Sequence, residues 1–106
     1  MSKYALIFTG GSIGSTQEEI QAKMQDWGVW YGSIGANLVD GGSAFMPHIT
    51  ASTVTNSGAE SGSKTGASGY VIVQAESKDV VLEYAKNCPI VSDGGSVDVH
   101  EFMVMN

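Results

Sequence analysis

The chain has 106 residues and a formal net charge of −6 at pH 7, and its hydrophobic fraction of 42% is ordinary for one globular domain spanning residues 1–106. It contains no arginine and only five lysines, so it lacks the groups that neutralise rows of phosphates, and we expect no nucleic-acid partner. No apolar run is long enough to cross a bilayer, no signal peptide is recognisable, and one cysteine cannot form an internal disulfide. We therefore expect a cytoplasmic protein that does not enter membranes.

The first predicted unit is a strand followed by a helix. Residues 4–8 form a continuous apolar run, which is typical of a buried strand. The capping-box spacing of a helix start is met by Ser15 with Glu18, and equally by Thr16 with Glu19. Apolar residues then recur at helical steps through Ile20, Met24, Trp27, Tyr31, Ile34 and Leu38.

The middle of the chain is predicted to be strand and loop. Residues 44–46 are β-prone and are followed by Pro47. Residues 49–55 are rich in Thr, Val and Ile, so they either continue this strand or pair with it. Residues 56–68 are nearly all small or polar, and their composition predicts a mobile loop that serves as a hairpin connection.

The second predicted unit repeats the order of the first. Residues 70–73 form another apolar strand, Ser77 can cap a helix that Pro89 stops, and residues 97–105 form a terminal strand. Two strand–helix–strand units in succession predict an α+β, ferredoxin-like βαββαβ fold. In that fold two helices cover one face of a four-stranded antiparallel sheet.

The sequence Asp-Gly-Gly-Ser occurs twice, at residues 40–43 and 93–96. Each copy is placed where a predicted helix leads into a strand, and the glycines permit the positive φ angles that such reversals need. We therefore predict the same connection in both halves of the chain. The alternative is that four matching residues recur by chance.

The predicted strands at residues 4–8 and 70–73 are apolar on both sides. Helices on one face of the sheet would leave the other apolar face in water, at a cost of several kcal/mol at about 25 cal/mol per Å². A second copy packed face to face on the open side would remove that cost, so a homodimer is predicted. The alternative is a monomer with a partly apolar exposed sheet.

The chain resembles the YCII-related domain family along nearly its whole length. The motifs that carry the resemblance are Tyr4–Phe8, Trp27-x-x-Trp30-Tyr31-Gly32, Leu38–Gly42, Gly69-Tyr70, Ala85-Lys86-x-Cys88-Pro89 and Gly94–Val99. The resemblance implies a small ferredoxin-like protein that forms a dimeric α/β barrel. In most members the activity is unknown, and some branches are thought to use a His and an Asp in a pocket between helix and sheet.

Aromatic residues Trp27, Trp30 and Tyr31 cluster on the predicted first helix. They either pack in the core or form the wall of a ligand pocket, with the indole N–H and phenol O–H groups as polar contacts. On a second stripe of the same helix, glycines recur at residues 28, 32 and 35. Either a strand, partner or ligand approaches that stripe closely, or the helix frays there.

The candidate groups for acid–base chemistry are His48, His100, Asp40 and Asp98. On a strand Asp98 and His100 would point to the same face about 7 Å apart, close enough for an electrostatic or water-bridged pair. The alternatives are that Asp40 is a turn residue and that the charges of the terminal strand protect an exposed edge.

No metal or cofactor is expected. No metal-ligand motif of short spacing occurs, and the glycine-rich loop at residues 10–15 lacks the lysine of a phosphate-binding loop. We predict a homodimer that binds a small molecule in a pocket between the first helix and the sheet. An enzyme using His/Asp general acid–base chemistry and a protein of assembly alone, without a pocket, are the alternatives.

Overall fold

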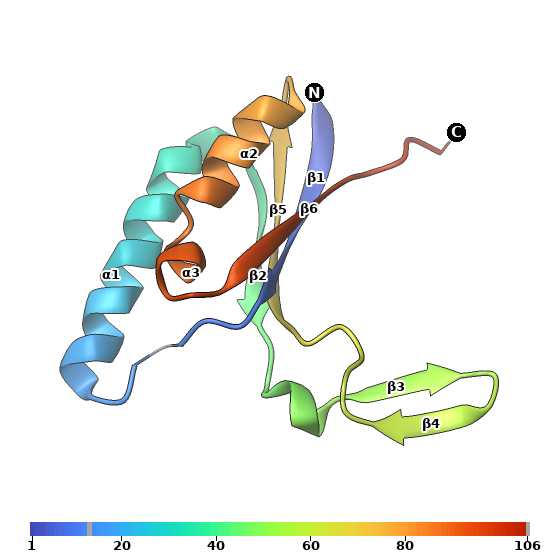
Figure 1. Ribbon diagram of the computed structural model, residues 1–106. Helices are drawn as coiled ribbons and strands as arrows, with labels where there is room; N and C mark the ends of the chain where they lie inside the picture. Colours follow the sequence, from blue (N-terminus) through green and yellow to red (C-terminus); the bar gives the residue numbers. More distant parts are fainter. Residues whose placement is uncertain (13, 106) are drawn as a thin grey trace.

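The structure is a computed structural model and describes residues 1–12 and 14–105 (Figure 1). The strands are β1 (Ser2–Thr9), β2 (Leu38–Ala44), β3 (Ser52–Thr55), β4 (Gly58–Ser61), β5 (Ala67–Ala75) and β6 (Ser96–Glu101). The helices are α1 (Gln17–Ile34), α2 (Lys78–Lys86) and the short α3 (Pro89–Ser92), with 3₁₀ turns η1 (Gly35–Asn37) and η2 (His48–Thr50). None of the helices in the described residues is both long and apolar enough to cross a membrane.

The predicted α+β class and the four-stranded antiparallel sheet are confirmed. The main sheet has the order β2-β5-β1-β6, and every neighbouring pair in it is antiparallel. Helices α1, α2 and α3 lie on one side of this sheet (Figure 1). Strands β3 and β4 form a second, two-stranded sheet, so the described residues form six strands in two sheets where four strands in one sheet were expected.

The core lies between the helices and one face of the main sheet. Leu6 and Val71 are opposite each other on the two central strands, and both are completely buried. The residues of the other parity, such as Ile7 and Ile72, are only partly buried. The continuous apolar runs therefore divide into a face that packs against the helices and a face that remains partly exposed.

Helix α1 begins with one of the two predicted capping boxes. The Thr16 hydroxyl accepts the Glu19 backbone N–H at 3.2 Å, and the Glu19 carboxylate accepts the Ser15 backbone N–H at 2.8 Å. The Ser15 N–H is the main cause of a lowered pKa at Glu19. The predicted continuation of the helix to Leu38 is wrong. Helix α1 ends at Ile34 because Gly35 adopts a φ of 61°, a left-handed value that favours glycine.

The two Asp-Gly-Gly-Ser motifs have different roles, which corrects the prediction of a shared connection. The first lies inside β2, where Asp40 accepts the backbone N–H of Gly42 at 2.8 Å and the pairing register with β5 shifts. Gly42 has a φ of 69°, and a Cβ there would overlap the carbonyl oxygen of Tyr70. The second motif links α3 to β6, as expected.

Three other boundaries differ from the prediction. The segment 56–68 includes strand β4, which pairs with β3 in a hairpin that is separate from the main sheet. Helix α2 ends at Lys86, and Pro89 is the first residue of α3 because proline fits the first turn of a helix. Strand β6 ends at Glu101, which pairs with Tyr4. One more backbone hydrogen bond to β1 follows, from the Phe102 N–H to the Lys3 carbonyl oxygen at 2.8 Å, so the predicted strand ends earlier than expected.

Candidate functional site

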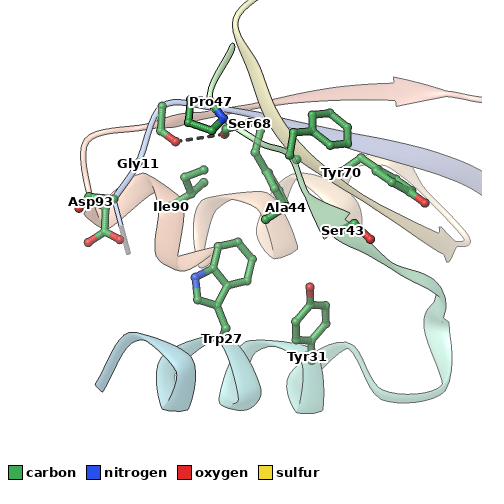
Figure 2. A pocket seen from close by; sticks show the side chains of 15 residues that line it. Gly11, Trp27, Tyr31, Ser43, Ala44, Pro47, Ser68, Tyr70, Ile90 and Asp93 are labelled. Carbon is green, nitrogen blue, oxygen red and sulfur yellow. Dashed lines mark hydrogen bonds between the residues drawn. The ribbon is translucent and has the colours of Figure 1, made fainter. Parts of the chain in front are cut away.

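A pocket of about 570 Å³ lies between α1 and the adjoining ends of β2 and β5. Its apolar and aromatic walls come from five separate parts of the chain. The principal side chains are Phe8, Trp27, Tyr31, Phe45, Tyr70 and Ile90. Figure 2 shows Trp27 and Tyr31 rising from α1 toward Ala44 and Ser43 of β2.

The helical wall consists of Trp27 and Tyr31, which are one helical turn apart and have ring centroids separated by 6.0 Å. Trp27 also packs edge-on against Phe8 of β1, with centroids 5.4 Å apart. The Tyr31 hydroxyl donates a hydrogen bond to the carbonyl oxygen of Gly41 at 3.0 Å, and burial raises the pKa of Tyr31. Both rings are thus fixed in place, and the phenol stays neutral at physiological pH.

The sheet wall is built where β2 leaves β5. The Phe45 backbone N–H donates to the carbonyl oxygen of Ser68 at 2.8 Å, which holds the end of β2 against β5. The rings of Phe45 and Tyr70 pack at 6.0 Å with an interplanar angle of 34°. Gly69 makes this approach possible, because a Cβ there would lie 2.9 Å from the carbonyl oxygen of Ser43.

The two tryptophans of α1 have different environments. The Trp30 indole N–H donates to the Tyr84 carbonyl oxygen at 2.8 Å, and Trp30 is only 3% exposed. Trp27 is half-buried and lines the pocket, and its indole N–H has no hydrogen-bond acceptor among the described residues. Of the three predicted aromatic residues, Trp27 and Tyr31 line the pocket and Trp30 belongs to the core.

The remaining side of the pocket carries an ion pair. Lys23 contacts the Asp93 carboxylate at 3.0 Å, and its ammonium group also donates to the Ser12 carbonyl oxygen at 2.8 Å. Gly11 lies tightly against Ile90, since a Cβ at Gly11 would come within 2.6 Å of that side chain. The charge of Asp93 is matched by Lys23, so this side offers no unbalanced charge to a ligand.

The four predicted acid–base residues lie outside this pocket. Asp40 and His100 are on opposite edge strands of the main sheet, three strand spacings or about 14 Å apart. Asp98 and His100 share an exposed face of β6, as the strand period requires. His48 is in η2, beside the hairpin. Within one chain, none of the described histidines meets an aspartate in the pocket.

Cys88 is buried, and desolvation raises the pKa of its thiol to about 11. The thiolate is therefore scarce at neutral pH, and nucleophilic chemistry at this residue is disfavoured. Within residues 1–12 and 14–105, no group of three or more His, Cys, Asp or Glu side chains is placed to hold a metal ion.

Sequence reasoning missed Phe45, Tyr70 and Ile90 as pocket residues. An aromatic residue at the edge of each predicted strand was the available signal for Phe45 and Tyr70. Ile90 carried no comparable signal, because its position depends on how α3 packs beside the glycine-rich loop. Neither the protein-family models nor the curated proteins searched gave a match to this chain.

Proposed function

We propose that this chain forms a homodimer and binds a small, neutral and mainly apolar molecule in the pocket of Trp27 and Tyr31. The pocket itself is the observation that carries the proposal. Its volume of about 570 Å³ is within the range of small-molecule sites, and its walls are mainly apolar, with five aromatic residues and a few polar groups.

The arrangement of the rings favours a flat ligand. Trp27 and Tyr31 form one aromatic pair on the helix, and Phe45 with Tyr70 forms another on the strands. A planar ring packed against Trp27 and Tyr31 would contact the π faces of the helical wall. The Trp27 N–H is then a hydrogen-bond donor for an acceptor atom on the ligand, which supplies orientation.

Charge favours a neutral ligand. Asp93 is the acidic side chain of the pocket lining, and Lys23 already neutralises it. An anion would approach a carboxylate and a chain of net charge −6, and a cation would have to compete with Lys23.

The fold and family expectations are part of the same proposal. We propose that the order β1-α1-β2-β5-α2-β6, taken without the β3–β4 hairpin, is a ferredoxin-like βαββαβ unit with an inserted hairpin and with α3 as an extra turn. We further propose membership in the YCII-related family, a dimeric α/β barrel formed through the open sheet face, and a cytoplasmic location, where the free Cys88 would remain reduced.

The ¹H–¹⁵N resonances of the two indole groups test the pocket directly. Quinoline is a neutral bicyclic molecule with an acceptor nitrogen, and titration with it should shift the Trp27 N–H resonance. The Trp30 N–H resonance should remain unchanged, because this N–H is already hydrogen-bonded to the Tyr84 carbonyl oxygen. Naphthalene has the same shape without the acceptor, so it should bind more weakly and shift the Trp27 N–H less.

A pair of variants supplies the control. Ala44→Leu adds bulk inside the pocket and should abolish the shifts, whereas Ala36→Leu adds the same bulk at an exposed position of η1 and should not. Equal shifts of both indoles, or unchanged binding by Ala44→Leu, would refute a ligand site at Trp27.

A further inference from the structure

The sheet face turned away from the helices carries two rows of side chains, each crossing all four strands. Residues paired directly across neighbouring strands share a face of the sheet, so the pairing register defines both rows. The first row is Asp40, Ile72, Ala5 and His100, and the second is Ser43, Tyr70, Ile7 and Asp98. A hydrogen bond of 3.4 Å from the Tyr70 hydroxyl to the Asp40 carboxylate confirms that these two side chains are on the same side.

Each row has an apolar centre and polar ends. Ala5, Ile7, Tyr70 and Ile72 on the two central strands are only partly buried. The ends of the rows, on the edge strands β2 and β6, are exposed and polar. An apolar centre with a polar rim is the usual anatomy of a protein–protein interface.

Two segments project on the same side of the molecule as this face (Figure 1). One is the β3–β4 hairpin, in which Val54 is 74% exposed, and the other is the segment after β6, in which Met103, Val104 and Met105 are each at least 79% exposed. A two-stranded hairpin without further packing is marginally stable in water, so contact with a partner would stabilise the β3–β4 hairpin. Both segments therefore offer additional surface to a partner on this face.

We propose that a second copy of the chain packs on this face about a two-fold axis parallel to the strands, which places His100 of one copy opposite Asp40 of the other. The inference rests on the homodimer proposed above. Rotation about such an axis exchanges the two edges of the sheet, so β2 of one copy lies over β6 of the other. The first row is self-complementary in this arrangement, because its carboxylate end meets the imidazole end of its symmetry mate.

Side-chain size favours this axis over one perpendicular to the strands. With the parallel axis, Ile72 lies over Ala5 and Tyr70 over Ile7, so large and small side chains alternate across the interface. A perpendicular axis would place β5 over β5, with Ile72 against Tyr70, and would leave Ala5 and Ile7 facing each other over a thinner layer. The parallel axis therefore gives the more even spacing between the sheets.

The arrangement assembles a pair that one chain cannot make. Asp40 and His100 of the same chain are about 14 Å apart, whereas facing sheets are about 10 Å apart, a gap that an imidazole and a carboxylate together can close. The Gly42 N–H already orients the Asp40 carboxylate, whose free lone pairs can accept an imidazole N–H. Two such His–Asp pairs would form per dimer, each at the edge of the interface, and they position the imidazole for proton transfer.

Thiol cross-linking tests the axis. Facing backbones about 10 Å apart are too distant for a disulfide, so a short bismaleimide is the appropriate reagent. A mixture of the Asp40→Cys and His100→Cys variants should yield covalent dimer, and neither variant alone should. The native Cys88 is buried with its thiol pKa raised to about 11, so it contributes little background.

A matched control uses the neighbouring position of β6. Glu101 is exposed but has the opposite parity to His100, so Glu101→Cys mixed with Asp40→Cys should not cross-link. Cross-linking of either single variant with itself, or of the Glu101 control as efficiently as His100, would overturn the axis while leaving the homodimer intact. Sedimentation of the unmodified chain as a monomer at micromolar concentration would instead refute the homodimer, and the inference with it.

Discussion

Replacing Gly28 or Gly32 with alanine should stabilise the protein. Both glycines are inside α1 with ordinary helical φ values, and a Cβ at either position would meet nothing within 4 Å. Glycine in a helix loses more backbone entropy on folding than alanine and adds no contact. These two residues therefore weaken α1 without improving any packing inside the chain.

The expected gain follows from helix propensity. Each substitution should raise the free energy of unfolding by about 0.8–1 kcal/mol. For a domain of about 100 residues, 1 kcal/mol corresponds to about 4–8 °C in Tm. The two sites are one helical turn apart and share no partner side chain, so the double variant should gain about twice as much as either single variant.

Thermal and urea unfolding followed by circular dichroism would measure the effect, and Gly35→Ala is the matched control. Gly35 also has open space around it, but its φ of 61° makes an alanine there strained, so this variant should lose stability. If Gly28→Ala and Gly32→Ala instead destabilised the protein, open solvent around this face would be the wrong description, and another chain would have to lie against it.

Three further outcomes are expected. Thr16→Ala should lower the free energy of unfolding by about 1 kcal/mol because the Glu19 N–H loses its acceptor, and chemical denaturation would measure this; an unchanged midpoint would argue against the capping box. Gly42→Ala should cost at least about 2 kcal/mol, since it combines an unfavourable φ with overlap on the Tyr70 carbonyl, and a stable variant would contradict the bulged course of β2. Burial raises the pKa of Cys88 from 9.0 to about 11, so its contribution to stability is complete below pH 9 and is lost as the pH rises toward 11. The difference in unfolding free energy between the native chain and Cys88→Ala should therefore shrink over that interval, and a constant difference would refute the assignment.

The candidate site was predictable in part. The spacing of Trp27 and Tyr31 placed two aromatic rings on one helical face, and both line the pocket. The same spacing could not separate Trp27 from Trp30, because a side chain faces a cavity or the core according to what the sheet places beside it. The opposite wall depends on Phe45 and Tyr70, which meet only because β2 pairs with β5 across a long sequence separation.

Elements that depend on neighbouring residues could be predicted from local sequence patterns. The apolar runs and the class of the fold follow from side-chain period, and the sequence alone was enough to predict them. The cap at Thr16 was one of two that the sequence predicted, and the structure selected it. Tertiary structure alone decided that the two Asp-Gly-Gly-Ser motifs differ, that the β3–β4 hairpin leaves the main sheet, and that a pocket opens beside Trp27. Four identical residues can bulge a strand or end a helix, and the choice depends on the distant backbone that supplies their hydrogen-bond partners.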